Sequence, residues 1–83
     1  MKTHPVTHDR IETDPAVMFG KPVIKGTRIT VESILRKLAA GMTTHEILVD
    51  HPHLTQDDIY AAPAFAADYL AQEEIIFPGT DKS

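Results

Sequence analysis

The sequence predicts a mainly helical fold, in which a short β-hairpin precedes three helices in a helix-turn-helix arrangement. Apolar residues recur at helical spacing from Val31 to Ala39. Thr43 and Thr55 each precede a short stretch with the pattern of a capped helix. Two β-branched segments before Val31 have the composition of a hairpin.

The size of the chain fits one domain. Its 83 residues leave no room for a second core, and we place the domain at residues 11–72, after an arm of residues 1–10 and before a tail of residues 73–83. A domain this small usually needs an additional stabilising link, and the absence of cysteine excludes disulfides. We therefore expect a homodimer or a permanent protein partner.

The hairpin is predicted from two β-branched segments, Val23-Ile24 and Ile29-Thr30-Val31. They flank Lys25–Arg28, and a four-residue loop with an internal glycine is common in β-hairpins. Ile11–Thr13 alternates in polarity but meets the turn signal Asp14-Pro15, so it predicts a short strand at most.

The first helix shows the strongest periodicity in the chain. Its apolar residues share one face, and Gly41 follows them as a C-terminal cap. These apolar residues are Val31, Ile34, Leu35, Leu38 and Ala39.

Capping patterns begin the second and third helices. Thr43 and Glu46 have the spacing of a capping box, and Pro52 ends that helix. Thr55 caps the third helix, whose first turn carries two aspartates. The apolar face of the third helix continues through Ile59, Ala62, Ala66 and Leu70, flanked by Phe65 and Tyr69.

Pro63 interrupts the third helix. Proline removes an amide donor and clashes with the preceding turn of a helix. We favour a kink within one helix. The alternative is a helix that ends near Tyr60 and restarts with Pro63 in its first turn, where proline is tolerated.

The chain shows no sign of a membrane or export segment. No apolar run approaches the roughly 20 residues that span a bilayer, and Met1–Pro5 is not followed by the apolar stretch of a signal peptide. We therefore expect a cytoplasmic protein.

Charge is divided unevenly along the chain. Residues 1–37 hold seven Lys and Arg against four acids, a net charge of +3, whereas residues 38–83 hold one Lys against eight acids, a net charge of -7. Clustered cations attract phosphates, so we predict that Lys21, Lys25 and Arg28 contact the backbone of double-stranded DNA.

Base contacts are expected from the helices. In a helix-turn-helix the last helix enters the major groove with its N-terminal residues leading. Gln56 and Tyr60 of the last helix and Thr44 of the second helix are the side chains that could read bases or touch the backbone. Asp57 and Asp58 repel phosphates, so we expect the last helix to bind the DNA bases only weakly.

No motif for catalysis, a metal or a cofactor is found. A phosphate loop needs glycine before lysine and then a helix, but Lys25 precedes Gly26 and a strand follows. The five histidines lack the spacing of a closed zinc site. Asp57 and Asp58 are neighbours that point in different directions on a helix. We therefore expect a binding protein and no enzyme.

The tail contains an apolar triplet, Ile75, Ile76 and Phe77, between Glu73-Glu74 and Pro78-Gly79. Soluble chains seldom leave three such side chains in water without a use. The triplet could cover its own bundle, pair with a second copy or dock on a partner. Since disulfides are absent and the core is small, we favour an intermolecular contact and predict these three as partner-binding residues.

Several stretches together resemble a known family. Gly20–Val31, with the sequence GKPVIKGTRITV, is similar to the signature of the domain of unknown function 433 (DUF433). So are Ile11–Pro15 and the runs from Ile34 to Asp68. The family resembles winged or homeodomain-like helix-turn-helix proteins, and many members resemble VapB-type antitoxins that are encoded beside a PIN-like nuclease toxin. Members usually carry an ordinary helix former where this chain has Pro63.

Two functional hypotheses follow. The resemblance implies an antitoxin-like regulator of a type II toxin-antitoxin module, which binds operator DNA as a homodimer and neutralises a PIN-like nuclease toxin by direct contact. The alternative is a protein-protein interaction module without DNA binding. The basic hairpin favours the first hypothesis, whereas Pro63 and the acidic start of the third helix favour the second.

Overall fold

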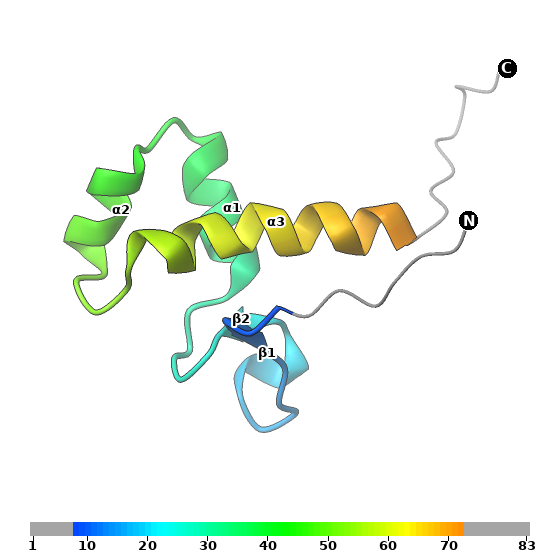
Figure 1. The fold of residues 1–83 in the computed structure, drawn as a ribbon. Helices are drawn as coiled ribbons and strands as arrows, with labels where there is room; N and C mark the ends of the chain where they lie inside the picture. Colours follow the sequence, from blue (N-terminus) through cyan, green and yellow to red (C-terminus); the bar gives the residue numbers. More distant parts are fainter. Residues whose placement is uncertain (1–7, 73–83) are drawn as a thin grey trace, which may run out of the picture.

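The computed structural model describes residues 8–72, which form a two-stranded sheet and three α-helices (Figure 1). The order is β1 (Ile11–Glu12), the 3-10 helix η1 (Met18–Gly20), β2 (Val23–Ile24), α1 (Val31–Ala39), α2 (Thr44–Asp50) and α3 (Gln56–Gln72). The predicted class, mainly helical with a short N-terminal hairpin, is confirmed.

The strand partners in the hairpin differ from the prediction. β1 and β2 are antiparallel, with Ile11 opposite Ile24 and Glu12 opposite Val23. Ile29–Val31 was expected to pair with β2, but this contact is a single bridge between Val23 and Thr30. Two 2.9 Å hydrogen bonds flank it, from the Ile24 amide to the Ile29 carbonyl and from the Val31 amide to the Pro22 carbonyl. The ladder stops there because Thr30 is already the N-cap of α1 and accepts from the Ser33 amide.

The predicted caps of α1 and α2 are confirmed. Gly41 follows α1 with a φ of 92°, a left-handed conformation that suits glycine after a helix. Thr43 and Glu46 form a reciprocal capping box at the start of α2. These two elements therefore follow from local sequence.

α3 is one helix across Pro63, and the alternative of two helices is wrong. Figure 1 shows it as a continuous helix without a sharp bend. Thr55 is the N-cap: its hydroxyl accepts from the Asp58 amide at 3.2 Å, and its own amide donates to the Asp58 carboxylate at 2.9 Å. Within residues 8–72, no helix is long and apolar enough to cross a membrane.

The core lies where the three helices and β2 meet. α3, with 17 residues, spans about 25 Å, whereas α1, with nine, spans about 13 Å. α3 therefore extends past the bundle, as Figure 1 shows. The apolar face predicted to run to Leu70 is buried only in its first part, and Leu70 is 52% exposed. The buried cluster is Ile24, Val31, Ile34, Ile47, Leu54, Ile59 and Ala62.

Candidate binding surfaces

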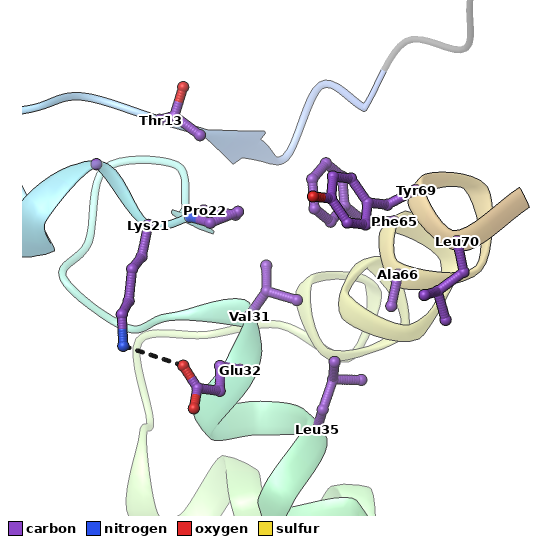
Figure 2. Close-up of a pocket in the computed structure, with 11 residues that line it drawn as sticks. Thr13, Lys21, Pro22, Val31, Glu32, Leu35, Phe65, Ala66, Tyr69 and Leu70 are labelled. Atoms are coloured by element: carbon purple, nitrogen blue, oxygen red, sulfur yellow. Dashed lines mark hydrogen bonds and ion pairs between the residues drawn. The ribbon is translucent and has the colours of Figure 1, made fainter. Parts of the chain in front are cut away.

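An apolar groove runs between α1 and the second half of α3 (Figure 2). The segment that follows η1 closes one side of it. Its volume is about 610 Å³. The part of α3 that extends past the bundle stands beside α1 and the hairpin, and no further helix among residues 8–72 covers it. Its lining residues are Thr13, Gly20, Lys21, Pro22, Val31, Glu32, Leu35, Phe65, Ala66, Tyr69 and Leu70.

The walls of the groove are predominantly apolar. Val31 is buried at its base, and Leu35 and Ala66 are half-buried on the two facing helices. Tyr69 and Leu70 stand on the rim of α3, where Tyr69 is 56% exposed. Tyr69 stacks on Phe65 with ring centroids 6.3 Å apart and an angle of 21° between the planes, which holds both rings beside the groove.

Three charged side chains mark the polar edge of the groove. The Lys21 ammonium lies 3.1 Å from the Glu32 carboxylate, and the Arg36 guanidinium donates to the same carboxylate at 3.0 Å. The hydrogen bond from Lys21 and then that from Arg36 lower the pKa of Glu32 below its ordinary value. Lys21, predicted to contact phosphates, is therefore paired within the domain.

Phe19, which precedes Gly20 of the groove lining, is a further candidate contact that was missed by the sequence reasoning. Its side chain is 94% exposed. Met18 and Phe19 both have left-handed backbone angles, with φ of 50° and 60°, which are unfavourable for residues with a side chain. A large aromatic residue that is both exposed and strained marks a candidate contact point. The signal in the sequence was the pair Met18-Phe19 directly before Gly20.

The predicted DNA-contacting residues do not form one site. Lys25 and Arg28 are exposed in the turn after β2 and make no ion pair within the part of the chain that the structure describes. Thr44 lies beyond the opposite end of α1, which separates it from that turn by about 13 Å of helix. Gln56 donates to the Tyr60 hydroxyl at 2.6 Å, so these two side chains bind each other.

Arg10 is the cation that neutralises the acidic first turn of α3. Its guanidinium lies 3.0 Å from Asp58 and 3.6 Å from Asp57. Burial raises the pKa of Asp58, but hydrogen bonds from Thr55 and Arg10 outweigh it and lower that pKa overall. The Lys25 amide donates to the Arg10 carbonyl at 2.7 Å, so the hairpin is tied to the start of α3 at this point.

A second contact joins the N-terminal segment to α3. His8 Nε2 lies 2.9 Å from the Asp68 carboxylate, and the His8 ring meets the edge of Phe65 at 5.3 Å. Among residues 8–72, no group of three or more His, Cys, Asp or Glu side chains could hold a metal ion. Ile75, Ile76 and Phe77, the predicted partner-binding residues, lie outside the described residues.

A family model described as "Protein of unknown function (DUF433)" matches residues 11–66. This chain belongs to the DUF433 family. It is also similar to the crystal structure of a DUF433 member protein from Anabaena variabilis ATCC 29413, with 30% identity and a TM-score of 0.71. That match covers 77% of this chain and 63% of the other, so this chain spans less than two thirds of that protein. No functionally curated protein matches.

The DUF433 match and the groove overlap only in part. The match includes the hairpin, α1 and α2, and it ends at Ala66 inside the groove wall. Tyr69 and Leu70, the exposed rim of α3, follow the matched residues.

Proposed function

We propose that this DUF433 chain is a non-catalytic binding protein that receives a partner protein in the groove between α1 and α3. The observation that carries this proposal is the apolar groove with two exposed side chains on its rim, Tyr69 and Leu70. Contiguous exposed apolar surface on a small domain is typical of protein interaction sites. The charged groups in its lining, Lys21 and Glu32, are paired with each other at one edge, whereas a small-molecule site needs polar groups that converge on the ligand.

The proposed partner is a PIN-like nuclease, which would make the chain an antitoxin-like protein of a type II toxin-antitoxin module in the cytoplasm. The resemblance of many DUF433 members to VapB-type antitoxins supports this class of partner. The net charge of the chain, -4, also supports it, because a nuclease must present cations to nucleic acid. The chain would inhibit the nuclease by direct contact.

The test uses the PIN-like nuclease encoded beside this gene, if the neighbouring reading frame specifies one. Calorimetry measures its affinity for the chain, and a cleavage assay measures its inhibition. Leu70→Lys places a charge on the groove rim, while Val49→Lys places the same charge near the end of α2 at a position that is 65% exposed and outside the groove.

We expect Val49→Lys to bind and inhibit like the parent. Burying one leucine side chain is worth about 1.5–3 kcal/mol, so Leu70→Lys should weaken binding at least tenfold. Equal affinity of both variants would show that the groove does not bind the partner. A neighbouring frame that encodes no nuclease would overturn the assignment of a nuclease as the partner.

DNA binding is a second candidate function, favoured by the turn after β2. Lys25 and Arg28 are exposed there, on an element next to Arg10 and the start of α3. A homodimer would present two such turns to a two-fold symmetric operator. Because the first turn of α3 is acidic and Gln56 is bound to Tyr60, we propose that phosphate contacts supply most of this affinity.

A further inference from the structure

We propose that, in the chain without a partner, the groove between α1 and α3 holds residues 75–77 of a second copy, so that two chains exchange their C-terminal segments. This exchange concerns the chain alone and is independent of which protein the groove receives later. A partner that uses the same groove would have to displace the exchanged segment.

The chemistry of the groove suits the segment. Val31, Leu35 and Ala66 provide an apolar base and facing walls, and Leu70 stands on the rim. Figure 2 shows the Val31, Leu35 and Leu70 side chains around the same space. Ile75-Ile76-Phe77 is a run of three bulky apolar residues shortly after Gln72 in the sequence, and nothing polar separates its members. Burial of such side chains is the main driving force of association.

Charge at the edge of the groove matches the residues that precede the triplet. Lys21 and Arg36 flank Glu32, so two cations surround one acid at this edge. Glu73 and Glu74 come directly before Ile75. With Glu32 included, this edge keeps a net charge of +1, so a segment that enters here would place its carboxylates near a positive edge, which favours this direction of entry.

The reach of the chain favours a second copy over the same copy. From Gln72, the three residues to Ile75 cover about 10 Å when fully extended. The distance back along α3 from Gln72 to Ala66 is about 9 Å. Only about 1 Å of that length would remain to reverse the direction of the chain, so Ile75 of the same copy does not reach the groove beside Ala66.

The turn chemistry points the same way. Glu73 and Glu74 contain no glycine, proline or asparagine that would favour a reversal directly after the helix. Pro78-Gly79, the turn signal in this region, comes after the triplet. A second chain has no such restriction, because its segment can approach the groove from outside, and two-fold symmetry makes the exchange reciprocal.

The first experiment measures the mass of the full chain alone by size exclusion with light scattering at micromolar concentration. Three variants are compared: Leu70→Lys alters the groove, Ile76→Lys alters the segment, and Val49→Lys is the matched control near the end of α2. We expect dimers for the parent and Val49→Lys, and monomers for Leu70→Lys and Ile76→Lys. Circular dichroism should give the same helix content for all four chains.

The second experiment mixes the two monomeric variants. Leu70→Lys keeps an intact segment and Ile76→Lys keeps an intact groove, so one productive contact is possible between them. We expect a 1:1 complex at least tenfold weaker than the parent dimer. As a check that does not depend on mixing, a labelled peptide of residues 72–79 should bind Ile76→Lys and not Leu70→Lys in fluorescence anisotropy.

Several results would overturn the exchange: a monomeric parent, a dimeric Ile76→Lys or Leu70→Lys chain, or a mixture and a peptide that both fail to bind. A monomeric parent whose stability falls in Ile76→Lys would assign the segment to its own bundle. None of these measurements uses a nuclease. If exchange fails but Leu70→Lys loses nuclease binding, the proposed function stands alone.

Discussion

Asp58 connects three parts of the chain through one carboxylate. It receives the Thr55 amide at the start of α3 and the Arg10 guanidinium from the N-terminal segment. Its side chain is only 14% exposed, whereas that of the neighbouring Asp57 is 74% exposed. The residue that seemed to oppose DNA binding is therefore a structural cap with a paired charge.

Replacement of Asp58 by Asn should destabilise the domain at neutral pH by about 1–2 kcal/mol, because hydrogen bonds to a charged group are stronger than those to a neutral amide. The pKa of Asp58 is lowered in the fold from its ordinary value of 3.8. Its ionisation thus stabilises the fold above that value, and this contribution is lost as the pH falls through the lowered folded pKa.

Urea unfolding from pH 7 to pH 2 measures this effect. The difference between the parent and Asp58→Asn should narrow below about pH 4. Asp57→Asn, in the same turn, should track the parent over the whole range. Parallel curves for the parent and Asp58→Asn would show that the carboxylate charge does not stabilise the fold.

Substitutions of Phe19 test whether its left-handed backbone conformation lowers the stability of the domain. Asn adopts left-handed angles more readily than other residues with a side chain. Phe19→Asn should therefore raise the free energy of unfolding by about 1 kcal/mol, measured by urea titration. Phe19→Ala removes the ring but keeps the strain, so it should stay near the parent. Equal stability of both variants would mean that the strain is negligible.

Single residues also show where sequence reasoning succeeds and where it stops. The caps at Thr43 and Thr55 were predictable because their partners lie three residues away. The pairing of Arg10 with Asp58 joins residues 48 positions apart, and no local pattern contains that information. The same holds for Lys21 with Glu32, which changed the role of a predicted DNA contact.

At the scale of elements, the positions of the helices were predictable from the sequence, but how much of each apolar helix face is buried was not. Periodicity indicates which face of α3 is apolar. How far along α3 this face is covered depends on α1 and α2, which are shorter. The candidate groove arises from this mismatch in length. The hairpin partner was also missed, because strands of two residues carry too little pattern to reveal that β1 pairs with β2.

Pro63 lies inside α3 and leaves the Ile59 carbonyl without its usual amide donor. Since α3 is continuous, Pro63→Ala should restore that bond and stabilise the domain by up to ~3 kcal/mol. The urea midpoint should rise with an unchanged slope. Pro52→Ala, in the exposed turn after α2, is the control and should not raise the midpoint. A lower midpoint for Pro63→Ala would show that the proline is needed where it stands.

Over the whole molecule, charge is arranged by pairing rather than by sequence halves. Arg10, Lys21 and Arg36 belong to the basic half of the sequence, yet each lies against an acid. Lys25 and Arg28 remain exposed without an ion pair in the described part of the chain. The net charge of a segment therefore overestimated the cations that are free to attract a polyanion.

This arrangement of ion pairs predicts which cationic side chains contribute most to any DNA binding. Each phosphate contact contributes roughly -0.9 to the slope of log affinity against log salt. With a duplex from upstream of the gene as the probe, Lys25→Ala with Arg28→Ala should reduce the magnitude of the parent slope by about two. Lys21→Ala should change it much less, because in the parent Lys21 is held by Glu32. Fluorescence anisotropy at several salt concentrations gives the slopes. If the double variant keeps the parent slope, the turn after β2 does not contact DNA, and an equal loss in Lys21→Ala would show that its ion pair opens on binding.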